Sequence, residues 1–343
     1  MTYDLAHHGD AEATPGLLDL AVNVRASGPP AWLVGRLQRG LDRLGAYPDP
    51  RAAVTAVARR HDRDPAEVLL TAGGAEAFVL LARALRPAHA VVVHPGFTEP
   101  ETALHAAGHD VHRLVLEPPY RLDPEQVPDA ADLVVVGNPT NPTGVVHEGL
   151  ERLCRPGRVV VVDEAFADAV PGEPHSLAAR ADLPGLVVVR SLTKTWSLAG
   201  LRVGYLLAPV DLVDQLRAAQ PLWAVSTLAL IAVETCLARG PVAMATKQAS
   251  ALGAERERLA VGLTSLGVEV GPGSQAPYLL CRVLGRPDVR EALRDKGIAV
   301  RRGDTFPGLG PEHWRTAVRG EAETAQLLAA LADVLGAPRD ASP

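Results

Sequence analysis

One segment of the chain combines an amine nucleophile with residues that could bind a phosphate. Ser191 and Thr193 carry hydroxyl groups two residues apart, Lys194 follows them, and Arg202 lies eight residues after the lysine. Only three residues of the whole chain are lysines, and arginine supplies nearly all of its positive charge. A solvated surface lysine is the ordinary alternative, but these neighbours favour the attack of an amine on a phosphorylated aldehyde.

A pair of glycines could complete the phosphate site. The segment Thr71-Ala72-Gly73-Gly74-Ala75 leads from a predicted strand into a predicted helix. Glycine lets backbone amides come close to an anion, and the N-terminus of a helix favours a phosphate. A plain turn between a strand and a helix would show the same pattern, so this segment alone does not decide between the two.

An acid and two amides follow other predicted strands. Asp163 stands directly after the four valines of residues 159–162. A carboxylate at the tip of a buried strand is costly unless it meets a cation or hydrogen-bond donors, and a helix cap or an ordinary ion pair would also satisfy it. In Asn138-Pro139-Thr140-Asn141-Pro142, each proline biases the preceding asparagine away from helix. The amides of this loop could recognise a hydroxyl or a carboxylate, or the loop could be an ordinary connection.

Together the four segments supply an amine, an acid, amide groups and a phosphate cup. Pyridoxal 5'-phosphate, a phosphorylated aldehyde on a pyridine ring, requires this set of groups. All four segments follow predicted strands, where α/β sheets bind their ligands. The sequence therefore predicts a pyridoxal phosphate site. The spacing of cysteines and histidines predicts no metal site.

Alternating strands and helices must position these residues. The predicted strands are Val68–Thr71, Ala90–His94, Val111–Leu116, Leu133–Gly137, Val159–Asp163, Leu186–Ser191 and Val203–Leu207. Several are continuous apolar runs, which are typical of strands buried on both faces of a parallel sheet. Helical segments between them indicate βαβ units, and hence an α/β fold with a doubly wound, mostly parallel sheet.

The pattern changes after this region. The predicted elements are long helices at Asp211–Leu237 and Ala254–Leu266, strands at Tyr278–Val283, Ile298–Arg301 and Thr316–Arg319, and helices at Val289–Lys296 and Ala322–Leu335. These form a smaller α+β domain. We expect residues 1–45 to be an N-terminal arm that joins this domain, residues 46–238 to be the large domain, residues 239–336 the small one, and residues 337–343 a disordered tail.

Length and composition exclude several classes of protein. A chain of 343 residues suggests two domains, and 47% apolar with 22% charged residues is a globular composition. A net charge of −6 gives no general attraction to nucleic acid or to an anionic membrane. No apolar run reaches the roughly 18 residues of a membrane span, and the N-terminus lacks the pattern of a signal peptide. Three scattered cysteines indicate no disulfide framework. We therefore expect a cytoplasmic protein that binds neither nucleic acid nor membranes.

The order of the motifs adds a family resemblance. The stretches NPTNPTG, DEAF, SLTK and GLRVGY closely resemble fold type I aminotransferases that depend on pyridoxal phosphate, in the histidinol-phosphate aminotransferase branch. Within that branch the chain is most similar to threonine-phosphate decarboxylases of cobalamin biosynthesis. Four stretches carry this closer similarity: residues 190–194, 220–226, 306–309 and 314–319. The resemblance covers residues 19–331 and implies a seven-stranded, mostly parallel sheet.

The resemblance implies roles at the cofactor. Lys194 matches the lysine that bonds the cofactor aldehyde, and Asp163 matches the acid that pairs with the pyridine nitrogen. Asn141 matches the amide at the ring 3'-oxygen, which often also contacts the substrate carboxylate. Phe97 matches the aromatic that stacks on the ring, and a core residue is the alternative. The residues that match the phosphate cup are Gly73, Gly74, Ala75, Ser191, Thr193 and Arg202.

Other matches concern the substrate and a second subunit. Tyr47 matches a tyrosine that reaches the cofactor phosphate of the neighbouring subunit, so the resemblance implies a homodimer with shared active sites. Arg315 matches the arginine that binds the substrate α-carboxylate through a bidentate contact. Arg301 and Arg319 could assist with a second anionic group of the substrate, or could be solvated arginines. The substrate expected is a small, phosphorylated amino acid, and Asn23 and Asn141 are also expected to bind it.

Three departures from the family pattern lie near the substrate. Phe166 stands where many relatives carry a tyrosine, although the decarboxylases often have phenylalanine too. The N-terminal segment His8-Gly9-Asp10-Ala11 replaces His-Gly-Gly-Asn. The next segment, residues 21–28, keeps only Asn23 and Gly28 of the family's Ser-x-Asn-x-Asn-Pro-Leu-Gly. This arm closes over the substrate in the family, so its side chains have drifted while the cofactor motifs are intact.

Several activities fit these motifs. We expect decarboxylation of L-threonine O-3-phosphate to (R)-1-amino-2-propanol O-2-phosphate, and the alternative is transamination of histidinol phosphate or another amino acid with 2-oxoglutarate. A regulator built on the same fold needs an N-terminal DNA-binding domain, for which the residues before Tyr47 leave no room. A non-catalytic homologue is expected to have lost Lys194 or Asp163, and both are present.

Overall fold

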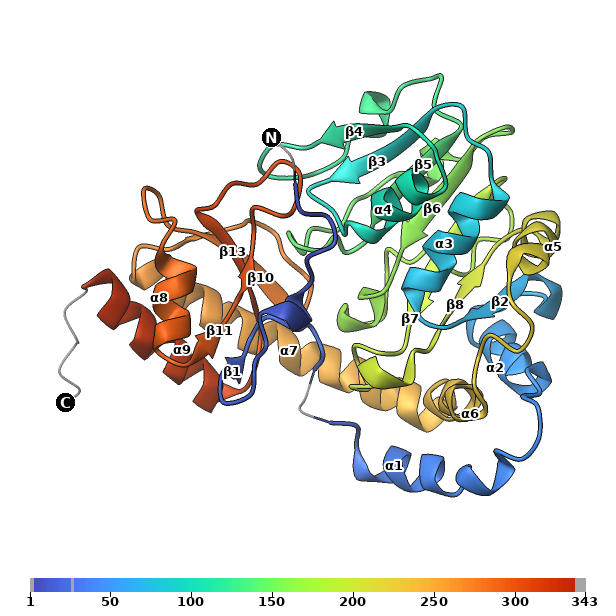
Figure 1. Cartoon of the computed structure of the whole chain (residues 1–343), viewed down its shortest axis with the longest axis horizontal. Coiled ribbons are helices and arrows are strands. Elements are labelled where there is room, and N and C mark those ends of the chain that lie inside the picture. Colours follow the sequence, from blue (N-terminus) through green and yellow to red (C-terminus); the bar gives the residue numbers. More distant parts are fainter. Residues whose placement is uncertain (1–2, 26–27, 337–343) are drawn as a thin grey trace.

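A seven-stranded sheet forms the larger part of the molecule. The computed structural model describes residues 3–25 and 28–336 (Figure 1). The strands of this sheet are β2 (Val68–Thr71), β3 (Ala90–His94), β4 (Val111–Val115), β5 (Leu133–Gly137), β6 (Val159–Asp163), β7 (Leu186–Ser191) and β8 (Gly204–Leu207). Their order is β2-β8-β7-β6-β5-β3-β4, in which only β8 runs antiparallel to its neighbours. The predicted α/β fold with a mostly parallel sheet is confirmed.

Helices cover both faces of the sheet. The α-helices are α1 (Ala31–Gln38), α2 (Arg51–His61), α3 (Gly74–Ala84), α4 (Glu99–Ala106), α5 (Val210–Ala219), α6 (Thr227–Cys236), α7 (Arg239–Ser265), α8 (Val289–Asp295) and α9 (Glu321–Leu335). On β6, Val160 and Val162 belong to the core that includes residues of α2 and α6. Val161 points to the opposite face and belongs to the core that includes residues of α3 and α5. Because both faces are buried, the strand is a continuous apolar run.

A second, antiparallel sheet lies beside the first. Its strands are β9 (Glu269–Val270), β10 (Tyr278–Arg282), β12 (Arg301–Arg302) and β13 (His313–Ala317), in the order β12-β13-β10-β9. Near the N-terminus, β1 (Leu18–Asp19) pairs in parallel with β11 (Ile298–Ala299). A separate apolar core joins residues of β10 and β13 to α7, α8 and α9. Figure 1 shows α7 running from α6 to this second sheet. The domain boundaries predicted from the sequence stay a prediction, and the predicted tail, residues 337–343, lies outside the described residues.

Short 3-10 helices connect the main elements. They are η1 (Gly9–Ala11), η2 (Leu41–Arg43), η3 (Pro65–Glu67), η4 (Pro124–Gln126), η5 (Leu150–Leu153), η6 (Ala167–Ala169) and η7 (Ala199–Leu201). Within residues 3–25 and 28–336, no single helix has the length and apolar character of a membrane span. Among these residues, only the consecutive helices α6 and α7, taken together, are long and apolar enough, and the angle between them is 71°.

Four predicted elements are wrong in extent. The helix expected at Ala254–Leu266 begins much earlier, as α7 (Arg239–Ser265), and the strand expected at Thr316–Arg319 is β13 (His313–Ala317). The helix expected at Asp211–Leu237 is two helices, α5 and α6, because Pro221 cannot continue α5 and Trp223 adopts a positive φ of 54°. Ser226 then caps α6 by accepting a hydrogen bond from the Ala229 amide at 3.2 Å. The strand expected at Ile298–Arg301 is also divided, since β11 pairs with β1 while β12 pairs with β13.

Candidate active site

The predicted segments meet at one edge of the seven-stranded sheet. Parallel β5 and β6 place Gly137 opposite Asp163, at the carboxyl ends of both strands. Since β8 runs antiparallel between β7 and β2, its first residue, Gly204, pairs with both Ser191 and Thr71. The carboxyl ends of β2 and β7 therefore flank the start of β8, and the segments that follow them are brought together.

Gly73 lies close to β8 and to Arg202 at this edge. A Cβ atom on Gly204 would lie 3.2 Å from Gly73 Cα, and a Cβ atom on Gly73 would lie 2.6 Å from Arg202 Nη2. Gly73 has a φ of +82°, which suits glycine, and is the N-cap of α3, where no described side chain caps the helix. The amides of the first turn of α3 and the Arg202 guanidinium thus form a cradle for an anion.

Two hydroxyl groups complete the cradle. Ser191 Oγ and Thr193 Oγ1 lie 2.7 Å apart and share a hydrogen bond. The Thr193 amide also donates to Ser191 Oγ at 3.3 Å. With Gly73, Gly74, Ala75 and Arg202 nearby, the set offers the amide, hydroxyl and guanidinium donors that a phosphate requires.

An acid and an amine lie in the same buried region. Burial raises the pKa of Asp163 to about 6, although the Ala165 amide donates to its carboxylate at 3.0 Å and Lys194 attracts it. Burial lowers the pKa of Lys194 to about 8, and the charges of Arg315 and Arg202 lower it further, whereas Asp163 opposes the shift. No ion pair within 4 Å joins Asp163 to Lys194 in the described part of the chain. The two charges therefore attract each other without a direct ion pair.

Aromatic side chains border the space beside the acid. A cavity there is lined by Phe97, Asn141, Asp163 and Phe166 together with the end of β5. Lys194 Nζ lies 6.0 Å from the centre of the Phe166 ring. Flat apolar faces around one acid fit an aromatic ring with a basic nitrogen. The residues present thus fit pyridoxal phosphate, because the edge offers an acid for its ring nitrogen, an amine for its aldehyde and a cradle for its phosphate.

Arg315 presents its charge to this region, and no carboxylate of residues 3–25 and 28–336 forms an ion pair with it within 4 Å. Its side chain is 4% exposed, Nη1 donates to Asn141 Oδ1 at 2.5 Å, and Nη2 donates to the main-chain oxygen of Ala21. Its Nε has no hydrogen-bond partner among the described residues. Burial and the neighbouring Arg301 lower the pKa of Arg315 to about 9. Neutral acceptors orient the guanidinium and leave its charge available to a carboxylate.

The N-terminal arm touches the other predicted substrate arginines in the same way. Arg319 Nη2 donates to the Val22 oxygen at 2.8 Å, and Arg301 Nη2 donates to the His7 oxygen at 2.6 Å. Asn23, which follows in the arm, is 5% exposed, and its Oδ1 has no hydrogen-bond partner in residues 3–25 and 28–336.

Like Arg202, Tyr47 is a predicted site residue that is exposed on the molecular surface. It is 76% exposed, and its ring stacks on that of Trp223 with 4.1 Å between the ring centres. The structure of one chain therefore does not place the Tyr47 hydroxyl with the cofactor residues, and its role stays a prediction.

Sequence reasoning missed Tyr278, which we interpreted only as the start of a strand. The residue is fully buried, and its hydroxyl donates to the main-chain oxygen of Thr140 at 3.1 Å. Its ring packs edge-on against Phe166 at 5.0 Å and lies 5.3 Å from the guanidinium carbon of Arg315. A tyrosine at the start of an apolar strand, in a chain with five tyrosines, was the available signal.

Two glycine variants test the phosphate cradle. In Gly73→Ala the new methyl group must displace the Arg202 guanidinium, whereas the Cβ atom of Gly108→Ala would meet nothing within 4 Å. The two glycines have similar φ values, +82° and +85°, so both variants should lose about 1–2 kcal/mol of stability. We expect only Gly73→Ala to bind pyridoxal phosphate at least tenfold more weakly, measured by fluorescence titration. Equal affinities in both variants would contradict the cradle.

Comparisons with known proteins identify the family of this chain. Residues 18–331 match the family model for class I and II aminotransferases. A histidinol-phosphate aminotransferase of Mycobacterium tuberculosis is 52% identical over 320 residues, which cover 92% of this chain and 87% of that protein. A threonine-phosphate decarboxylase of Salmonella typhimurium is 33% identical, covering 93% of this chain and 91% of that one.

The fold is shared with solved structures. The histidinol-phosphate aminotransferase of Clostridium acetobutylicum superimposes with a TM-score of 0.86 at 24% identity, covering 93% of this chain and 99% of that one. This likeness supports a fold type I architecture. The chain therefore belongs to the class I and II aminotransferase family, and it is an enzyme that uses pyridoxal phosphate as its cofactor.

Proposed function

We propose that the chain is an aminotransferase that acts on histidinol phosphate or a related amino compound, with 2-oxoglutarate as amino acceptor. The observation that carries this proposal is the 52% identity to histidinol-phosphate aminotransferases of mycobacteria, over 92% of this chain. The amine of Lys194, whose pKa burial lowers to about 8, and Arg315, which forms no ion pair in the described part of the chain, supply groups that this reaction needs. The comparisons thus favour the alternative over the decarboxylase that the motifs led us to expect.

Decarboxylation of L-threonine O-3-phosphate is the second candidate. Phe166 favours it, since this position is often phenylalanine in the decarboxylases that the sequence resembles. The 33% identity to a threonine-phosphate decarboxylase over 93% of the chain supports it independently.

Lys194 is the base in the proposed transamination. Bound pyridoxal phosphate supplies an aldehyde that joins the substrate amine and a ring that withdraws electrons from the substrate Cα. A lysine with a pKa of about 8 is partly neutral near pH 7, so Nζ can take the Cα proton and return it elsewhere. The Asp163 carboxylate would pair with the protonated ring nitrogen, and the positive charge of that nitrogen would favour the ionised form of Asp163.

Arg315 and Asn141 orient the substrate. The carboxylate of glutamate or 2-oxoglutarate forms an ion pair with the Arg315 guanidinium. Asn141 and the Ala21 oxygen fix the position of that guanidinium. Orientation decides the reaction, because only a bond perpendicular to the cofactor ring is weakened. Transamination needs the Cα–H bond there, within reach of Lys194, and decarboxylation needs the bond to the carboxylate.

Arg301 and Arg319 are proposed to bind the phosphate end of the substrate. Arg301 is 2% exposed, and its terminal nitrogens donate to neutral oxygens of His7, Arg302 and Thr305. No acidic side chain forms an ion pair with Arg301 or Arg319 in the part of the chain that the structure describes. One buried and one half-buried cation, neither in an ion pair among these residues, favour a multiply charged anion.

Product analysis separates the two candidates. The holoenzyme is incubated with histidinol phosphate and 2-oxoglutarate, or with L-threonine O-3-phosphate with and without 2-oxoglutarate, and products are identified by mass spectrometry. We expect glutamate from the first mixture only. Carbon dioxide from threonine phosphate without the keto acid would establish the second candidate instead. No turnover in any mixture would contradict both, with Lys194→Ala as the inactive control and Lys247→Ala as the active one.

We further propose a homodimer in which Tyr47 reaches the partner's cofactor phosphate. The exposed pair Tyr47 and Trp223, with Leu222 79% exposed beside them in sequence, supports an interface there. Tyr47→Phe keeps the ring and loses one hydroxyl, so we expect it to stay dimeric in analytical ultracentrifugation. It should lose the cofactor about tenfold faster than wild type, as for one hydrogen bond to a charged group. A wild-type monomer with full activity would contradict this role.

A further inference from the structure

Asn141 and Arg315, the two residues proposed to orient the substrate, come from different sheets. Asn141 lies in the loop after β5, and Arg315 lies on β13 of the antiparallel sheet. Their side chains nevertheless meet, since Arg315 Nη1 donates to Asn141 Oδ1 at 2.5 Å. The geometry of this contact depends on how the loop is joined to the antiparallel sheet.

The segment before β10 packs directly on the loop that carries Asn141. Ser274 forms an antiparallel bridge with Val145, and the Gln275 amide donates to the Gly144 oxygen at 2.8 Å. Gly144 has a φ of +73°, and a Cβ atom on it would overlap Ser274 Oγ. Both the backbone conformation and the close approach of the two segments therefore require glycine. These bonds hold the loop on the C-terminal side of Asn141.

Tyr278 holds the loop on the other side of Asn141. Its side chain is fully buried, and its hydroxyl donates at 3.1 Å to the main-chain oxygen of Thr140, the preceding residue. The same oxygen accepts the Gly144 amide at 2.7 Å, which closes the turn of the loop, so the Tyr278 bond ties this closed turn to β10. Burial raises the pKa of Tyr278 well above its usual value, which keeps the hydroxyl protonated and able to donate.

The ring of Tyr278 also contacts Arg315. In the register of β10 and β13, Tyr278 pairs with Ala317 and Leu280 pairs with Arg315. Since alternate residues of a strand share a face, the side chains of Tyr278 and Arg315 lie on the same face of the sheet. The guanidinium carbon lies 5.3 Å from the ring centre, a distance at which the ring face attracts a cation. One side chain thus holds the loop with its hydroxyl and the guanidinium with its ring.

The contact with Arg315 also fixes the direction of the Asn141 amide. A guanidinium only donates hydrogen bonds, so the acceptor Oδ1 faces Arg315 and the donor Nδ2 points away from it. Asn141 and Phe166 line the same cavity beside Asp163. Of these two side chains, only the amide can donate a hydrogen bond to a ring oxygen, because Phe166 has no hydroxyl. A displacement of the loop would therefore alter a hydrogen bond to the cofactor ring.

We propose that Tyr278 is a positioning residue that holds Asn141 and Arg315 as one unit, with its hydroxyl on the loop of the first and its ring against the second. This inference rests on the proposed roles of Asn141 at the cofactor ring and of Arg315 at the substrate carboxylate. It gives a task to a fully buried hydroxyl, which is costly unless it is hydrogen-bonded.

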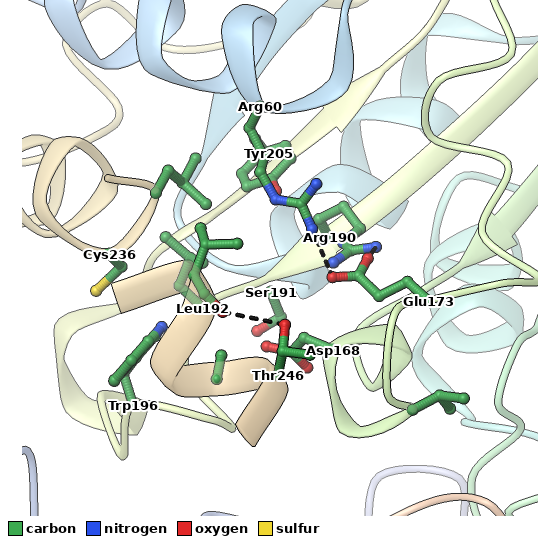
Figure 2. A pocket seen from close by; sticks show the side chains of 14 residues that line it. Arg60, Asp168, Glu173, Arg190, Ser191, Leu192, Trp196, Tyr205, Cys236 and Thr246 are labelled. Carbon is green, nitrogen blue, oxygen red and sulfur yellow. Dashed lines mark hydrogen bonds and ion pairs between the residues drawn. The ribbon is translucent and has the colours of Figure 1, made fainter. Parts of the chain in front are cut away.

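A second buried tyrosine supplies the matched control. Tyr205 is 1% exposed, and its hydroxyl lies 2.8 Å from His61 Nε2, with which it shares a hydrogen bond. It lines another cavity, shown in Figure 2, which neither Asn141 nor Arg315 lines. Tyr278→Phe and Tyr205→Phe thus each remove one buried, hydrogen-bonded hydroxyl and keep the ring.

The first readout is the pH midpoint of the visible absorption of bound pyridoxal phosphate, which needs no substrate. An amide that donates to the ring oxygen favours the form with the larger negative charge there, which is the deprotonated one. We therefore expect Tyr278→Phe to raise the midpoint by about 0.5 unit, as for a weakened hydrogen bond. Tyr205→Phe should match wild type, and equal midpoints in the two variants would overturn the inference.

A double-mutant cycle tests whether the effect passes through Asn141. Asn141→Ala alone should raise the midpoint by about one unit, and adding Tyr278→Phe to it should cause no further change. A further rise in the double variant would contradict the inference, because Tyr278 would then act through another group. If Asn141→Ala leaves the midpoint unchanged, the role of Asn141 at the ring is wrong, and the inference with it.

The second readout is the dissociation constant of 2-oxoglutarate, measured by calorimetry on the holoenzyme. Tyr278→Leu loses the ring as well as the hydroxyl, so Arg315 loses the face against which it is held, and we expect about fivefold weaker binding. Tyr278→Phe keeps the ring and should bind 2-oxoglutarate as wild type does. Equal dissociation constants in these two variants would overturn the role of the ring.

The two readouts also separate this inference from the proposed function. If Tyr278→Leu does not fold, the phenylalanine variants and the cycle still decide whether the hydroxyl positions Asn141. A wild-type holoenzyme that binds no 2-oxoglutarate would contradict the proposed transamination, while the pH midpoints would still test Tyr278.

Discussion

The site depends on burying an amine and an acid at one sheet edge without letting them form an ion pair. A buried charge is costly, and a direct pair between Lys194 and Asp163 would reduce that cost. The sheet prevents it by fixing Asp163 at the last position of β6 while Lys194 follows β7 on an irregular turn. Both pKa values consequently move toward the neutral range, to about 6 and about 8. Groups that titrate near neutral pH suit proton transfer and covalent attachment of an aldehyde.

The three predicted substrate arginines are likewise held without an ion pair among the described residues. Arg315, Arg301 and Arg319 donate to main-chain oxygens of Ala21, His7 and Val22 in the N-terminal arm. A carbonyl oxygen orients a guanidinium without neutralising it, so the charge stays available to an anion. Main-chain oxygens are also independent of residue type. The arm can therefore depart from the family pattern in its side chains and still hold the three arginines.

Much of this arrangement could be predicted from the sequence, because it depends on local patterns. The valine run of β6, the glycines before α3 and the segment from Ser191 to Lys194 each indicated both an element and a chemical role. What could not be predicted depends on contacts between distant segments. The carbonyl partners of the arginines and the Tyr278 hydroxyl on Thr140 leave no mark in a local pattern. The choice between transamination and decarboxylation depends on the orientation of a bond, which residue types do not encode.

The most direct test of the central claim is the titration of Lys194 in cofactor-free enzyme. The chain has three lysines, so a protein labelled with 15N in its lysine side chains should give three amine signals by nuclear magnetic resonance. One signal should titrate with a midpoint near pH 8 and should be missing from Lys194→Ala. If no signal that is lost in Lys194→Ala titrates below about pH 10, the ordinary range for lysine, the amine is not poised as described here.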